Sequence, residues 1–152
     1  GSGSKKGTKT GGTGSTTNPP PPPKPSTYDG FGFDDNANKV WDELDRYIEN
    51  RYPNDANKQA SLNQMAKALQ AGVKAGNAKD DSAAQSARAA ISKANYCLLE
   101  RMGSVEVMNK ESSSLEVEML KSGANRSKAY QEFNALLSGG FYGSDQRENP
   151  CE

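Results

Sequence analysis

Large apolar residues recur at helical spacing in the segment 37–52, where they lie at i, i+1, i+4, i+7, i+8 and i+12. Charged residues fill most of the positions between them. Pro53 follows directly, and proline stops a helix because it has no backbone N–H to donate. The pattern therefore predicts a helix from about Ala37 to Tyr52, whose apolar face comprises Val40, Trp41, Leu44, Tyr47, Ile48 and Tyr52.

Two alanine-rich segments follow with the same periodicity. The first predicts a helix from residue 54 or 55 to about Ala75, ended by a turn at Gly76-Asn77. The second begins at a possible capping box, Ser82 with Gln85 three residues later, and ends at Gly103. Because small alanines let two helix backbones approach closely, these helices are expected to form an antiparallel hairpin. Their apolar stripes are Leu62, Met65, Ala66, Leu69 and Val73, and Ala84, Ala87, Ile91, Ala94 and Leu98.

Two further segments predict helices over about 104–122 and 125–138. The first has an apolar seam interrupted by Ser112-Ser113-Ser114, which could break the helix, and the second ends at Gly139-Gly140. No window alternates apolar and polar residues in the manner of a strand. We therefore expect an all-α fold, an antiparallel bundle of four or five helices. The two seams comprise Val105, Met108, Leu115 and Met119, and Ala129, Tyr130, Phe133, Leu136 and Leu137.

The first 27 residues contain none of the hydrophobic residues Ala, Val, Ile, Leu, Met, Phe, Trp, Tyr and Cys. Residues 1–18 are rich in Gly, Ser, Thr and Lys, a composition typical of a flexible coil. Pro19 to Pro23 form an unbroken run, which favours the stiff polyproline II helix. The chain thus divides into a disordered proline-rich tether (1–27), a helical domain (28–143) and a frayed C-terminal end (144–152).

Charge follows the same division. The tail carries Lys5, Lys6, Lys9 and Lys24 and no acid, so 15 of the 19 basic residues and all 19 acidic residues remain in the domain. The domain is therefore mildly acidic and has no dense basic run, which argues against nucleic acid as a partner. No stretch approaches the roughly 18 apolar residues of a membrane span, so no direct span is expected in this chain.

The residue types also limit the chemistry. The chain has no histidine, which excludes Ser-His-Asp and Cys-His catalysis and His-based metal sites. The acidic and amide residues between Asp29 and Asn38 lack the register of an EF-hand and are better explained as helix caps. We therefore expect that the protein is not an enzyme and that it binds no cofactor, no metal and no small-molecule ligand.

Two cysteines, Cys97 and Cys151, leave two alternatives open. They could form a disulfide that pins the C-terminal end to the middle of the domain, or Cys97 could be a buried free thiol and Cys151 an exposed one. A disulfide would favour an oxidising location, in the periplasm, at the cell surface or in the secreted fraction. A cytoplasmic location is the alternative.

Four aromatic residues lie in glycine-rich segments that flank the predicted bundle: Phe31, Phe33, Phe141 and Tyr142. They could cover the ends of the bundle, or they could be exposed anchors for a protein partner, because aromatic residues dominate binding hot spots. The proline run followed by Lys24 formally matches Pro-x-x-Pro-x-basic, but a spacer explains it better.

These observations favour a non-enzymatic protein-binding or assembly module of the cell envelope, held to a membrane or a larger protein by its proline-rich linker. One alternative is a cytoplasmic adaptor whose proline run is the ligand. Another is a small secreted effector or inhibitor.

Overall fold

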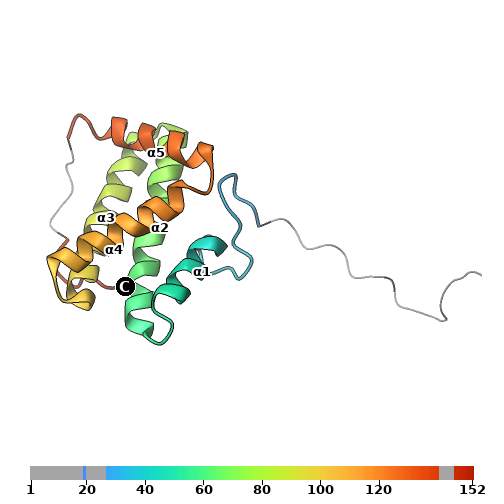
Figure 1. The fold of residues 1–152 in the computed structure, drawn as a ribbon. Coiled ribbons are helices and arrows are strands. Elements are labelled where there is room, and N and C mark those ends of the chain that lie inside the picture. The colour runs from blue at the N-terminus through green and yellow to red at the C-terminus, as the bar shows by residue number, and fades with distance from the viewer. Residues whose placement is uncertain (1–18, 20–26, 141–145) are drawn as a thin grey trace, which may run out of the picture.

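The computed structural model describes Pro19, residues 27–140 and residues 146–152. It contains the helices α1 (Asp42–Arg51), α2 (Ala56–Ala78), α3 (Asp81–Met102), α4 (Val105–Leu120) and α5 (Ala124–Leu136), and these described residues include no strand. The predicted all-α fold is confirmed. The long helices α2 and α3 lie side by side, α4 crosses them, α5 lies across one end, and α1 packs beside α2 (Figure 1).

The turn between α2 and α3 is tighter than the sequence predicted. Helix α2 continues through Gly76 to Ala78, and Lys79 then adopts a left-handed conformation with φ of 52°. Asp80, not Ser82, caps α3, because its side chain accepts the Ala83 backbone N–H. The predicted turn at Gly76-Asn77 and the Ser82 capping box were therefore both wrong.

Gly76 lies inside α2 because α5 crosses there at very short range. A Cβ atom at this position would lie 1.9 Å from the backbone oxygen of Ala129. At Gly72, one turn earlier, a Cβ would lie 2.9 Å from the Phe133 ring. Both glycines are thus explained by close helix packing, because a side chain at either position would prevent it.

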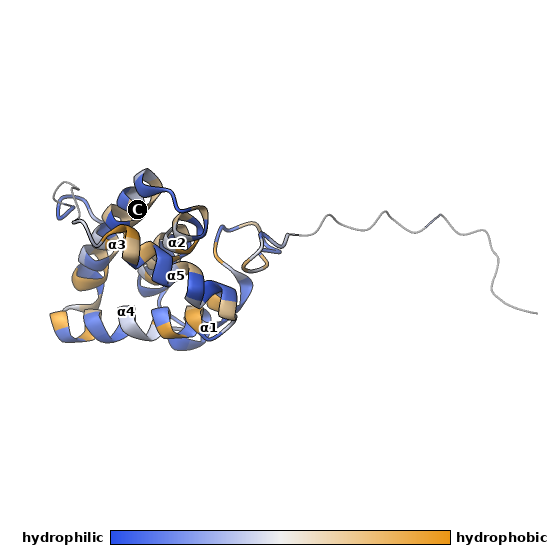
Figure 2. Cartoon of the chain, turned by 90° about the horizontal axis from the view of Figure 1, so that it is seen from above, coloured by the Kyte–Doolittle hydropathy of each residue, from blue (hydrophilic) through white to orange (hydrophobic). Residues whose placement is uncertain are grey.

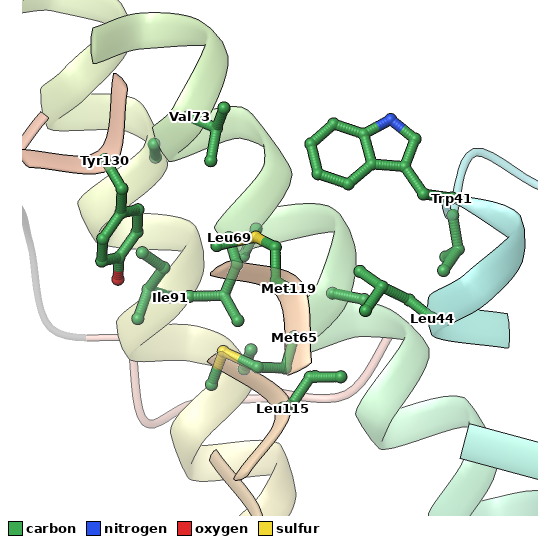
Figure 3. Close-up of a cluster of buried hydrophobic side chains, with 14 of the residues drawn as sticks. Trp41, Leu44, Met65, Leu69, Val73, Ile91, Leu115, Met119 and Tyr130 are labelled. Carbon is green, nitrogen blue, oxygen red and sulfur yellow. The ribbon is translucent and has the colours of Figure 1, made fainter. Parts of the chain in front are cut away.

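The core collects one apolar face from each helix (Figure 3). Helix α4 contributes Leu115 and Met119, both fully buried, and stays helical through its three serines. Each serine lowers helix propensity by about 0.5 kcal/mol relative to alanine, whereas burying a Leu or Met side chain contributes about 1.5–3 kcal/mol. Packing therefore outweighs local propensity. The other large core residues in Figure 3 include Trp41, Leu44, Met65, Leu69, Val73, Ile91 and Tyr130.

A buried carboxylate joins α1 to α4. Glu111 on α4 is 1% exposed and accepts the Arg51 Nε–H at 2.8 Å and the Tyr52 hydroxyl at 2.9 Å. Burial alone would raise the pKa of Glu111, but these hydrogen bonds outweigh it and hold the pKa below its usual value. The carboxylate therefore stays charged, and its two partners fix the C-terminal end of α1.

Helix α1 begins at Asp42, five residues later than the predicted start at Ala37. Ala37 and Lys39 have left-handed backbones, with φ of 58° and 71°. Asp34 holds this loop by accepting the backbone N–H groups of Asn38 and Lys39. The polar residues before α1 thus cap the N–H groups of a loop rather than those of the helix.

Cys97 and Cys151 form a disulfide across a sequence separation of 54 residues. The end of the chain is also held by Gln64, whose side-chain amide donates to the Pro150 carbonyl and accepts the Glu152 backbone N–H. Residues 150–152 are therefore docked on the bundle, and of the two alternatives for the cysteines the structure has the disulfide that pins the C-terminal end to the domain.

Figure 2 shows hydrophilic and hydrophobic residues interspersed along the helices. Among the described residues, no helix is long and apolar enough to cross a membrane.

Candidate functional site

Of the predicted aromatic anchors, the structure describes Phe31 and Phe33 and gives them different surroundings. Phe31 is half-buried, with its ring centre 6.3 Å from that of Trp41 at the edge of the core. Phe33 is 51% exposed and pairs with Tyr28, 49% exposed, at 4.9 Å between ring centres. Phe31 thus helps to cover the bundle, while Tyr28 and Phe33 together present ring surface to solvent. The other two predicted anchors, Phe141 and Tyr142, lie outside the described residues.

A cleft of about 420 Å³ lies beside this aromatic pair, and we call it the aromatic cleft. The N-terminal loop, residues 27–41, forms one side. Glu43 of α1 and residues around the turn between α4 and α5 form the other. The loop side comprises Tyr28, Phe31, Gly32 and Phe33, and the facing side comprises Glu43, Ser122, Asn125 and Arg126.

Arg126 organises the floor of the aromatic cleft although only 2% of it is exposed. Its Nε–H donates to the Phe31 carbonyl at 2.8 Å, and its Nη1 donates to the Met119 carbonyl at 3.0 Å. Its Nη2 forms an ion pair with Glu43. The guanidinium also lies over the Trp41 ring, 4.1 Å from its centre. One buried cation thus connects the loop, α1, α4 and α5.

Gly32 allows this close contact. A Cβ atom there would lie 2.6 Å from Cγ of Trp41 and 2.7 Å from Nη2 of Arg126, so any larger residue would push the loop outward. On the facing side, the Asn125 side-chain amide donates to the Gly30 carbonyl at 2.8 Å. The loop is therefore attached to α5 on both sides of Phe31.

Asp29 fixes the conformation of the loop. Its carboxylate accepts hydrogen bonds from the backbone N–H groups of Phe31 and Gly32 and, at 2.8 Å, from the Trp41 indole N–H. It also forms an ion pair with Lys74 at 3.0 Å. Partial burial would raise the pKa of Asp29, but the bond from Trp41 and the other three contacts outweigh it and lower the pKa to about 2. The carboxylate remains ionised across the physiological range and joins the loop to Trp41 and to Lys74 of α2.

Asp35 and Asp42 hold the segment that carries the aromatic pair. Asp35 is exposed and accepts the Thr27 hydroxyl at 2.6 Å, at the point where the tail joins the domain. Asp42 in turn accepts the Asp35 backbone N–H at 3.0 Å. Within the described residues, no group of three or more Asp, Glu or Cys side chains is arranged to hold a metal ion.

Sequence reasoning identified Phe33 but missed the supporting residues Arg126 and Asp29. Tyr28 lies in the segment recognised from sequence, yet its pairing with Phe33 needed the structure. Arg126 could not be found from sequence because a single arginine in an amphipathic helix is usually exposed. The cleft thus brings together the rings of Tyr28 and Phe33, the Asn125 side-chain amide and the Arg126–Glu43 ion pair.

No protein-family model, no curated protein and no solved structure matches this chain.

Proposed function

We propose that this chain is a non-enzymatic protein-binding or assembly module that presents the aromatic cleft next to a proline-rich tether. The observation that supports it is the Tyr28–Phe33 pair, two large rings each about half exposed beside a cleft of about 420 Å³. Aromatic side chains contribute much contact area at little entropic cost, and they are enriched at the centres of protein interfaces.

The support under the pair strengthens the proposal. Arg126, Asp29 and Gly32 hold the loop through buried or charged contacts, so the rings are ordered before a partner arrives. A pre-ordered loop avoids part of the entropy cost of binding. Loops of this kind, fixed on a rigid scaffold, commonly carry binding residues.

The Cys97–Cys151 disulfide supports an extracytoplasmic location, since such bonds persist in oxidising compartments. In this proposal the tail holds the domain at a distance from a membrane or a larger protein. The flexible composition of residues 1–18 would supply reach, and the proline run would supply stiffness.

The test compares two double variants of the full chain as baits for proteins extracted from the cell envelope of the source organism. Y28A/F33A removes the exposed ring pair, and V105A/V117A removes two exposed apolar side chains of α4, 57% and 63% exposed. Both should fold, because all four side chains are largely outside the core. We expect Y28A/F33A to lose partners that V105A/V117A retains, and equal capture by both variants would contradict the proposal.

A further inference from the structure

We propose that the occupant of the aromatic cleft is the proline run Pro19–Pro23 of a second copy of this chain. The inference rests on the proposed function, because it names the partner of the same cleft. In this proposal the tail is both a spacer and a ligand for neighbouring molecules of the same chain.

The chemistry of a proline run matches the aromatic cleft. Consecutive prolines adopt the polyproline II helix, carry no N–H groups, and present carbonyl oxygens and flat apolar rings. Proteins recognise such segments with aromatic grooves, in which proline rings pack between side-chain rings. Here Tyr28 and Phe33 supply the ring faces, and the Asn125 amide, which carries two N–H groups, lines the facing side. A volume of about 420 Å³ falls within the usual range for a bound ligand segment.

Charge favours the same occupant. Lys24 directly follows the run, and the whole tail carries four lysines and no acid. Residues 28–152 carry 15 basic and 19 acidic residues, and the one arginine among the lining residues of the cleft, Arg126, is paired with Glu43. A cationic proline segment would therefore approach a domain of net negative charge, and opposite charges steer association.

The run of the same molecule is poorly placed to enter the cleft. Tyr28 itself lines the cleft, and Thr27, directly before it, is bonded to Asp35. Only Lys24, Pro25 and Ser26 separate the run from Thr27, so a stiff run would have to reverse direction over a connection of three residues, one of them proline. The run of a second molecule has no such restriction. A tail-to-cleft contact is heterologous, so it gives either a reciprocal pair or an extended assembly.

The test measures self-association of the full chain by sedimentation over a range of concentrations, with the disulfide intact. One variant replaces each proline from 19 to 23 with serine and so removes the ligand. The second, Y28A/F33A, removes the cleft. Each alone should associate at least tenfold more weakly than the parent chain, while V105A/V117A should match the parent. An equimolar mixture of the two defective variants should associate again, because one supplies a cleft and the other a proline run.

Three results would overturn the inference: a parent chain that stays monomeric, a serine variant that associates like the parent, or a mixture that does not associate. If the parent is monomeric but the serine variant binds a free peptide of residues 17–27, the cleft recognises the proline run but is filled by the tail of the same molecule. That result would overturn the choice of a second copy as the occupant. If Y28A/F33A loses its captured partners while self-association is unaffected by the serine changes, the proposed function stands and only this occupant is wrong.

Charge provides an independent measurement. Lys24→Glu should weaken self-association at low ionic strength, and the difference from the parent should shrink as salt screens the charges of the tail and of the acidic domain. No effect of Lys24→Glu at low salt would contradict the charge argument and, with it, the choice of this occupant.

Discussion

The guanidinium of Arg126 lies 4.1 Å from the centre of the Trp41 ring, and the same group bonds the Phe31 carbonyl. Trp41 precedes α1 and Arg126 belongs to α5, so this contact joins the two ends of the helical domain. The aromatic cleft thus depends on an arginine that is almost entirely hidden.

Replacement of Arg126 should destabilise the domain and loosen the N-terminal loop. Arg126→Met removes the partner of a Glu43 oxygen that has no accessible surface and no other bonding partner, which should lower the free energy of unfolding by about 2–4 kcal/mol. Arg126→Lys should recover only part of this, because an ammonium cannot reproduce the fork of a guanidinium. Denaturant unfolding followed by the fluorescence of Trp41, the only tryptophan, provides the measurement.

Lys121→Met is the matched control, since Lys121 forms an exposed ion pair with Glu118. It should change stability by less than about 0.5 kcal/mol. Full stability of Arg126→Lys would show that the fork geometry is not needed.

Asp29 should make the free energy of unfolding of the domain depend on pH at acid pH. Its pKa in the folded protein is about 2, below the ordinary value of 3.8, so its stabilisation is present above pH 3.8 and is lost as the pH falls toward 2. Asp29→Asn should therefore lower the free energy of unfolding near neutral pH by about 1–2 kcal/mol, and the difference from the parent should shrink as the pH falls through the folded pKa of about 2. Urea unfolding across this range measures it, and a constant difference at every pH would contradict the assignment.

Gly76→Ala should separate α2 from α5. Alanine normally favours a helix over glycine by about 1 kcal/mol, but here its Cβ would meet the Ala129 backbone oxygen at 1.9 Å. We expect a net loss of about 2 kcal/mol or more, measured as a lower thermal midpoint. Gly139→Ala is the control, because a Cβ there meets nothing within 4 Å, and it should be close to neutral. Equal stability of the two variants would mean that the helices can move apart freely.

Reduction of Cys97–Cys151 should weaken the domain and free its C-terminal residues. Closing a loop of 54 residues contributes roughly 4 kcal/mol in the chain-entropy model, as an upper estimate. A dithiol reductant should lower the unfolding midpoint and expose the Glu152 backbone N–H, now bound by Gln64, to hydrogen exchange. C97A/C151A should match the reduced parent and should not respond to reductant. An unchanged midpoint would assign the stability of this end to the Gln64 contacts alone.

Much of the fold could be predicted from sequence because helix formation leaves a local signal. The apolar spacing that ends at Tyr52, the stripe through Leu69 and the seam through Met119 each recur every three or four residues, which identifies a helix and its inner face. The same local reasoning recognised Phe33 as an aromatic in a glycine-rich segment, and it left the pairing of the two cysteines open.

Tertiary structure decided the features that depend on distant segments. Whether Gly76 ends α2 or lies inside it was set by α5 crossing at that point. The cleft was assembled in the same way, since Asp29 and Arg126 meet Trp41 only after the bundle has packed. Periodicity reports which face of a helix is buried, but the identity of its neighbours is a property of the packed chain.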